Sequence, residues 1–175
     1  MKILSKKTLI LLGLVIMAPI TASAAVVDLN STSNLNPVEL NLTAGTYNVN
    51  PFAGTFTSWN AWGPTTGCDN AGANCTKGWI NNYSIDTSET AAFLISDGGR
   101  YSTPELALLN SLSTTFTLLS DATVKFFIND SNYNDNTGGM SLNVSAVPIP
   151  AAAFLFAPAL LGFMGLRRKA KNTVA

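Results

Sequence analysis

Short stretches in which apolar and polar residues alternate recur through the middle of the chain, separated by residues that favour turns. Within residues 123–129, Val124, Phe126 and Ile128 alternate with the side chains between them, and Leu142 and Val144 show the same spacing. A period of two residues is typical of a strand with one buried face. Eight stretches of this kind predict strands, at residues 38–42, 46–50, 55–62, 78–85, 91–96, 113–119, 123–129 and 140–145.

Two segments depart from this alternation. Residues 26–37 are mostly polar and predict an arm or an edge strand. Ser102 or Thr103 can cap a helix whose first turn holds Pro104, and Glu105 completes a capping-box pattern. Eight short strands and one short helix predict an all-β domain, a β-sandwich or jelly roll.

The N-terminus has the three parts of a secretory signal peptide. Residues 1–7 are basic, residues 8–20 are mostly apolar, and Ala22-Ser23-Ala24 is a small-x-small cleavage site. We expect signal peptidase to remove residues 1–24 by cleaving between Ala24 and Ala25. The alternative is a retained anchor, but the short apolar stretch and the Ala-x-Ala favour removal.

The C-terminus predicts a membrane-spanning segment. Two prolines in four residues fit neither a sheet nor a helix, so Val147, Pro148, Ile149 and Pro150 form an extended linker. Residues 151–166 carry no charge, and the apolar stretch counted from Val147 has 20 residues, about the length that spans a bilayer. A basic end follows at residues 167–171, with Arg167, Arg168, Lys169 and Lys171. By the positive-inside rule this end stays cytoplasmic and the preceding domain lies outside.

The charges are segregated along the chain. Seven of the ten basic residues lie at the two ends, so residues 25–146 keep three basic residues and all ten acids, a formal charge of −7. An acidic surface repels phosphate backbones, which argues against a nucleic-acid partner. It is compatible with an exported domain and with divalent cations.

The tail resembles a known sorting signal. A short proline motif, one apolar helix and a terminal basic cluster resemble the PEP-CTERM signal, and Val147-Pro148-Ile149-Pro150-Ala151 resembles its Val-Pro-Leu-Pro-Ala variant. Ile149 stands where the usual motif has Glu. The resemblance implies that residues 147–175 are processed by an exosortase in a Gram-negative bacterium that makes exopolysaccharide. The protein would pass through the inner membrane and finish at the cell surface or in the extracellular matrix. A plain single-span anchor is the alternative.

The two cysteines lie in one loop. Six residues separate Cys68 from Cys75, and the chain contains no histidine, so the pair cannot complete a zinc site of four Cys and His ligands. In an oxidising compartment a disulfide is expected. The alternative, a redox-active pair, lacks the Cys-x-x-Cys spacing.

The middle region lacks the motifs of common catalytic sites. Without histidine it cannot form a Ser-His-Asp or Cys-His arrangement, and it has no Gly-x-Ser-x-Gly or phosphate loop. Asp130 and Asp135 are close in sequence, but nothing else supports a glycosidase pair. We therefore expect no enzyme activity.

Residues 127–139 are rich in oxygen ligands. They contain Asp130, Asp135, several amide side chains and two glycines, a composition that suits Ca²⁺. The EF-hand pattern is absent, because Asp135 replaces its required glycine and Ser141 its final Glu. A polar turn without an ion is the alternative, since Asn, Asp and Gly favour turns on their own.

This loop resembles the calcium loop of the bacterial galactophilic lectins. The matching positions are Asp130, Tyr133, Asp135, Asn136 and Gly138. The resemblance implies calcium bound by side chains of Asp130, Asp135 and Asn136. It also implies two backbone carbonyl ligands, from Asn132 and from the Trp62 that precedes Gly63-Pro64. The loop is shorter than in the family, Asp135 replaces an Asn, and the family's sugar-contacting histidine has no counterpart.

Together these features predict an exported, non-catalytic, calcium-assisted carbohydrate-binding protein whose partner is a surface or matrix polysaccharide. The alternative is a purely structural envelope or biofilm protein that binds no sugar. Three tryptophans are available to stack on sugar rings or to fill the core: Trp59, Trp62 and Trp79.

Overall fold

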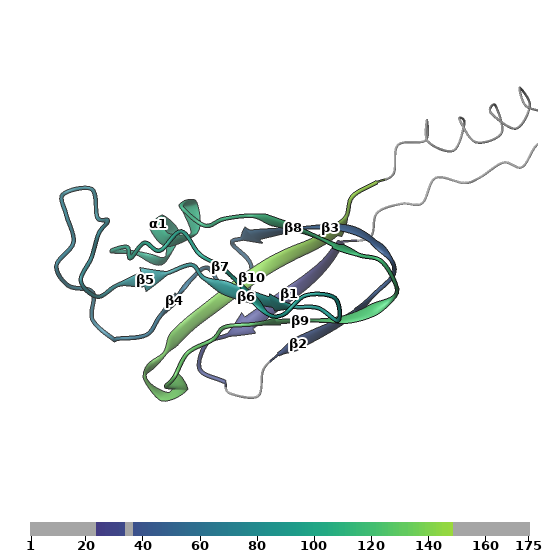
Figure 1. Ribbon diagram of the computed structural model, residues 1–175. Helices are drawn as coiled ribbons and strands as arrows, with labels where there is room; N and C mark the ends of the chain where they lie inside the picture. The colour runs from purple at the N-terminus through teal and green to yellow at the C-terminus, as the bar shows by residue number, and fades with distance from the viewer. Residues whose placement is uncertain (1–23, 34–36, 149–175) are drawn as a thin grey trace, which may run out of the picture. The chain divides into compact units, whose positions relative to one another are not determined.

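The computed structural model describes residues 24–33 and 37–148. The predicted membrane helix and basic end lie outside them, as does nearly all of the predicted signal peptide. The strands are β1 (Ala24–Asn30), β2 (Val38–Leu42), β3 (Gly45–Phe52), β4 (Trp59–Asn60), β5 (Trp79–Ile80), β6 (Tyr83–Asp86), β7 (Phe93–Ile95), β8 (Thr114–Leu118), β9 (Ala122–Phe127) and β10 (Thr137–Ala146). The helices are α1 (Pro104–Leu109) and the single 3₁₀ turn η1 (Tyr133–Asp135) (Figure 1).

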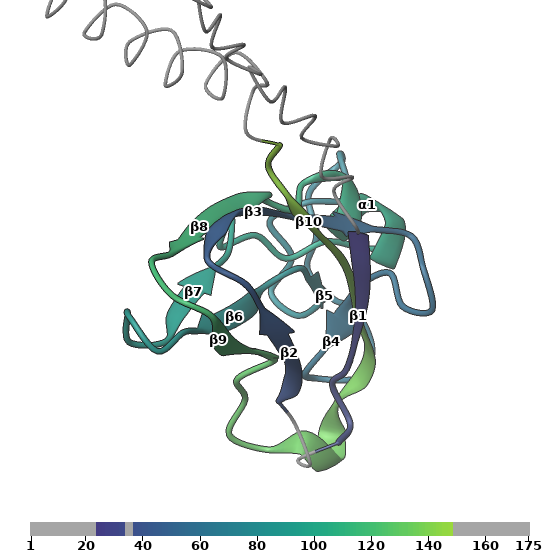
Figure 2. The same ribbon diagram turned by 90° about the vertical axis from the view of Figure 1, so that its right-hand side faces the viewer.

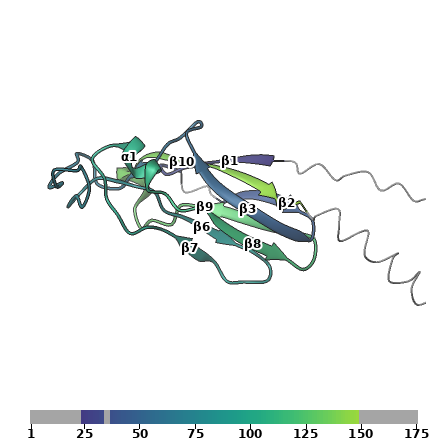
Figure 3. The same ribbon diagram turned by 90° about the horizontal axis from the view of Figure 1, so that it is seen from above.

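The strands form two antiparallel sheets. The first has the order β5-β4-β10-β3-β8, with β1 also paired to β10, and the second has the order β2-β9-β6-β7. Figure 2 shows β8 and β3 above β7, β6 and β9, and in Figure 3, seen from above, β3 overlaps β9. Residues 24–33 and 37–148 are therefore all-β with one short α-helix, as the alternation predicted.

The core lies between the sheets. Inward-facing residues from both are buried almost completely: Val27, Leu29, Val49, Ile85, Val124, Phe126, Ile128, Leu142 and Val144. Phe116 of the first sheet stacks on Tyr47 at 5.5 Å and meets Phe126 of the second sheet edge-on at 6.4 Å between ring centroids. Burial of this apolar surface is the main force holding the sheets together, and the arrangement fits a β-sandwich.

Two predicted strands are wrong in extent. In the predicted strand at residues 55–62, only Trp59–Asn60 forms strand pairs. The turn before it is fixed by a side chain instead, because the Phe56 N–H donates to Ser141 Oγ at 2.9 Å. The predicted 78–85 strand is split into β5 and β6 at Asn81-Asn82. There the Asn81 side-chain amide donates to the carbonyl oxygen of Ala107 in α1 at 2.8 Å. This side-chain hydrogen bond to the helix stands where the backbone pairing of the predicted strand was expected to continue.

The helix begins as predicted at one of its two candidate caps. Thr103 is the N-cap, and its hydroxyl accepts from the Leu106 N–H at 3.2 Å. Ser102 lies one residue before the cap, and its N–H donates to the Gly72 carbonyl oxygen at 2.8 Å. Glu105 is therefore the second helical residue, one position short of the capping box.

β10 connects the two ends of the domain. At its C-terminal end Ser145 pairs with Ala24 at the start of β1, and the Val147 N–H donates to the Thr46 carbonyl oxygen at 2.8 Å. At its N-terminal end, about 30 Å away for ten residues of strand, it meets the loop 128–136 (Figure 1). Residues 26–30 belong to β1, which among the described strands pairs only with β10, so the edge strand, one of the two predicted alternatives, is confirmed for them. Within residues 24–33 and 37–148, no helix is long and apolar enough to cross a membrane.

Candidate functional site

The two loops of the predicted calcium site leave the same end of the first sheet. Asn60 of β4 pairs with Thr137 of β10, and Trp59 pairs with Gly138. Trp62 follows Asn60 by two residues and Asp135 precedes Thr137 by two. Because the two strands are antiparallel, both loops therefore leave the sheet at the same end. A side chain at Gly138 would collide with the Ser58 carbonyl oxygen, which explains a glycine at this close crossing.

Asn136 is the buried member of the set. It is 6% exposed, and its Nδ2 donates to the Ser31 carbonyl oxygen at 3.0 Å. Its Oδ1 is also buried and has no hydrogen-bond partner within the described residues. A buried acceptor without a partner costs about 1–3 kcal/mol. An ion or an ordered water at this oxygen would remove that cost.

The other loop members are solvent-accessible. Asp130 Oδ1 accepts from the Ser131 N–H at 2.8 Å. Asn132 caps η1, its Oδ1 accepting from the Asn134 N–H at 3.3 Å, which leaves its backbone carbonyl as the proposed ligand. Asp135 ends η1 and is exposed. The loop thus holds two carboxylates and one buried amide oxygen within seven residues.

Asn60 fixes the second loop. This buried side chain accepts from the Trp62 N–H at 2.8 Å and donates to the Gly63 carbonyl oxygen at 2.9 Å. Gly63 has φ +73°, a conformation that glycine adopts without steric cost. The conformation of the Trp62-Gly63-Pro64 turn is therefore fixed by the Asn60 side chain and not by hydrogen bonds between strands.

The residues present suit a hard cation. Carboxylate, amide and carbonyl oxygens are the ligands that Ca²⁺ prefers, and the orphaned Asn136 oxygen fits that need. The described part of the chain holds no cluster of three or more Asp, Glu, Cys or His side chains. The predicted set contributes two carboxylates and would depend on neutral oxygens for the remainder.

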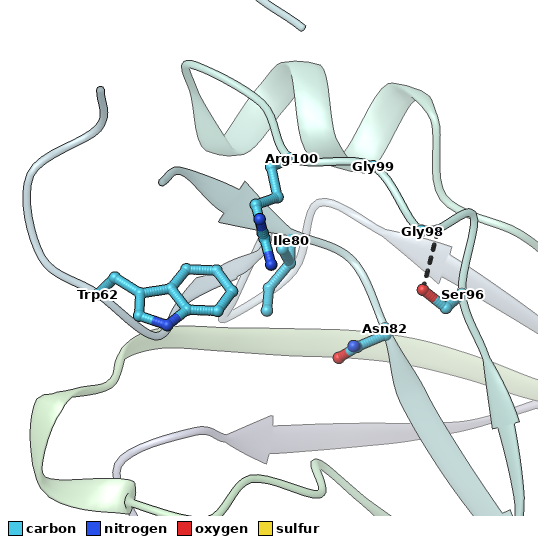
Figure 4. Close-up of a pocket in the computed structure, with 7 residues that line it drawn as sticks. All are labelled: Trp62, Ile80, Asn82, Ser96, Gly98, Gly99 and Arg100. Atoms are coloured by element: carbon cyan, nitrogen blue, oxygen red, sulfur yellow. Dashed lines mark hydrogen bonds between the residues drawn. The ribbon is translucent and has the colours of Figure 1, made fainter. Parts of the chain in front are cut away.

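The Trp62 ring borders a pocket that the sequence did not reveal. The Arg100 guanidinium carbon lies 4.5 Å from the Trp62 ring centroid, a cation–π contact. Figure 4 shows Arg100 beside Trp62, with Ile80 next to Arg100, Asn82 below and Ser96 on the side opposite Trp62. The lining is completed by the backbone of Gly98 and Gly99.

Arg100 is held in place from both ends. Its carbonyl oxygen accepts from the Cys75 N–H at 3.1 Å, and its Nη1 donates to the Thr76 carbonyl oxygen at 3.2 Å. Cys75 is bonded to Cys68, as predicted. Asp69 orders the rest of this loop, its carboxylate accepting from the Ala71 and Ala73 N–H groups at 2.9 Å, and these bonds lower the pKa of Asp69.

Tyr101 anchors the segment that follows the pocket. Its backbone exchanges two hydrogen bonds of 2.8 Å with Trp79, and its hydroxyl donates to the Asp97 carboxylate. Burial and the contact with Asp97 raise the pKa of Tyr101 to about 12. The Asp97 carboxylate also accepts from the Gly99 N–H at 2.9 Å. Both of its oxygens are therefore hydrogen-bonded to residues of the same short segment.

The three tryptophans have different places. Trp59 is 2% exposed and belongs to the core, with Nε1 donating to the Asn82 carbonyl and side-chain oxygens at 3.1 Å. Trp79 is partly buried in β5, and Trp62 is 37% exposed.

No family model, curated protein or solved structure matches this chain.

Proposed function

We propose that this is an exported, non-catalytic glycan-binding protein whose β domain uses calcium to order its binding end. The observation that carries the proposal is the buried Asn136 Oδ1, which has no partner among the described residues and lies in a loop with two carboxylates. The proposed ligands are the side chains of Asp130, Asp135 and Asn136 and the backbone carbonyls of Trp62 and Asn132.

Calcium would act on both loops at once. The strand register directs the Trp62 and Asp135 loops to one edge, so an ion shared between them would offset the repulsion of Asp130 and Asp135. It would also fix the Trp62 turn beside the pocket. A sugar hydroxyl can complete the coordination of such an ion in the same way as water.

The export signals supply the context for a matrix sugar as partner. Both predicted signals join the domain at one end, next to the Ala24–Ser145 pair, and the candidate site is at the other end of β10. A sorting tail cut by an exosortase would thus leave the binding end free to meet an exopolysaccharide.

A structural role is the second candidate. The Asn136–Ser31 hydrogen bond joins the loop to the turn after β1, so an ion there would also stiffen the contact between strands. In that case calcium raises stability and no sugar binds.

A glycan array probed with the full chain separates the two candidates. We expect binding of neutral glycans in calcium, its loss in chelator, and its loss in calcium for Asp135→Asn. Asp121→Asn is the matched control, since it removes the same charge at the opposite end of β9 and keeps an acceptor for the Ala44 N–H, 2.9 Å from Asp121 Oδ1. Stabilisation by calcium without binding of any sugar would support the structural role.

A further inference from the structure

We propose that the Trp62–Arg100 pocket binds a carboxylate-bearing sugar residue, such as a uronic acid, with the Arg100 guanidinium as the carboxylate ligand. The proposal rests on the proposed function for the class of ligand, a glycan. The pocket itself contains none of the side chains proposed to bind calcium, and its sugar contacts do not require the ion.

The charge of Arg100 is not balanced by a carboxylate. Residues 25–146 hold ten acids against three basic residues, and Lys125 already faces Glu39 at 3.9 Å. Among the described residues, Arg100 forms no ion pair, and Asp97 nearby is engaged by Tyr101 and Gly99. A guanidinium kept free of carboxylates in so acidic a domain is suited to an anionic ligand.

The guanidinium is also pre-ordered. An exposed arginine normally loses rotamer entropy when it binds a ligand, but the stacking on Trp62 and the bond from Nη1 to Thr76 already restrict Arg100. The disulfide loop fixes its backbone through Cys75. The remaining N–H groups keep the planar fork that matches a carboxylate in a bidentate manner.

The rest of the lining suits a sugar ring. Ile80 is buried at the floor and offers apolar surface. Asn82 Oδ1 is occupied by the Trp59 indole N–H, so its Nδ2 remains as a donor to a sugar hydroxyl. A Cβ at Gly98 would meet no atom within 4 Å, so the backbone of this lining residue is bare and a ligand can approach it closely.

A single carboxylate is favoured over a dense polyanion. The formal charge of −7 on the domain repels phosphate-rich polymers, and at 0.1 M salt this repulsion acts only over about 10 Å. A uronic acid brings one planar charge on a ring whose hydroxyls match the Asn82 and Ser96 side chains.

The test compares trigalacturonate with galactotriose of the same linkage, which differ only in the carboxylates. The full chain is titrated in a detergent without a sugar headgroup and in chelator, because uronates bind calcium themselves. We expect trigalacturonate to bind at least about tenfold more tightly, with the Trp62 indole N–H signal shifting in NMR spectra. Arg100→Gln should weaken this binding by about tenfold to a hundredfold, the range for a charge-assisted hydrogen-bond pair.

The controls distinguish this proposal from the calcium site. Lys125→Gln removes the same charge from β9 and should bind as the wild type does, and Arg100→Lys should retain part of the affinity. Arg100→Gln should keep any stabilisation by calcium. Equal affinity for the two trisaccharides, or no binding of either, would overturn the proposal whether or not calcium binds, and so would unchanged affinity in a folded Arg100→Gln protein.

Discussion

The side-chain amide of Asn136 donates to the carbonyl oxygen of Ser31 at 3.0 Å, joining two residues 105 positions apart. The bond fixes the residue before β10 to the turn after β1. It also fixes the orientation of the Asn136 amide, whose oxygen is buried.

Replacing Asn136 tests both ends of this amide. We expect Asn136→Ala to change the free energy of unfolding in chelator by about 1 kcal/mol or less, because the Ser31 carbonyl oxygen loses its donor while the buried, unpartnered Oδ1, whose cost is of similar size, is removed. The variant should also lose any stabilisation by calcium. Chemical denaturation with and without calcium measures both effects, and a variant that calcium stabilises as fully as the wild type would contradict the proposed role of Oδ1.

The disulfide should contribute to stability and to the pocket. The double change Cys68→Ala and Cys75→Ala should lower the free energy of unfolding by about 2 kcal/mol, the effect of opening a small loop. Because the Cys75 N–H anchors Arg100, trigalacturonate binding should weaken as well. Alkylation of the unreduced protein should label neither thiol. Complete labelling would show that the bond is absent in the exported protein.

Alkaline pH should destabilise the protein through Tyr101. Its folded pKa is raised from 10.0 to about 12 by burial and by Asp97, so stability present below pH 10 is lost as the pH rises through about 12. Tyr101→Phe should be less sensitive over this range. Some loss should remain, because burial also raises the pKa of Tyr83. Denaturation at pH 9 and pH 11 gives the comparison, and equal slopes in the two proteins would refute the assignment to Tyr101.

The tail should be removed after export. The last backbone bond of the domain runs from the Val147 N–H to the Thr46 carbonyl oxygen, so cleavage beyond Val147 would leave β10 intact. Intact-mass analysis of surface or medium protein should find a species without residues 154–171. A mature protein that retains them would favour a simple membrane anchor.

The sequence predicts those strands that are marked by alternating apolar and polar residues within their own length. β2 has the predicted bounds, and β9 and β10 follow from their alternating apolar residues. Residues 55–58 and 81–82 were predicted as strand because their composition resembles that of a strand. Side-chain bonds from Ser141 and Asn81 compete there with the ladder, and such partners cannot be identified from spacing alone.

The pocket was not predictable for a similar reason. Trp62 and Arg100 are 38 positions apart and meet only because Tyr101 pairs with Trp79 and Cys75 bonds to the Arg100 carbonyl oxygen. The one signal in the sequence was the scarcity of basic residues in an acidic domain. That signal applies equally to Lys77, Arg100 and Lys125, so it did not single out Arg100 or indicate its neighbours.

Substitutions at the proposed calcium site distinguish side chains that bind the ion from side chains that only lie near it. Asp130→Asn should reduce the stabilisation by calcium because it removes a proposed carboxylate ligand, whereas Trp62→Phe should preserve it because only the Trp62 carbonyl is proposed to bind. Trp62→Phe should still weaken trigalacturonate binding, since the smaller ring forms a weaker contact with Arg100.

Calorimetric melting of the full chain in calcium and in chelator tests the central claim most directly. A ligand that binds only the folded state at a hundredfold excess over its dissociation constant adds about 2.7 kcal/mol of stability. We therefore predict a higher melting temperature in calcium for the wild type and for Asp121→Asn, with most of the increase lost in Asp135→Asn. Identical melting temperatures in calcium and chelator for the wild type would contradict a calcium site between these loops.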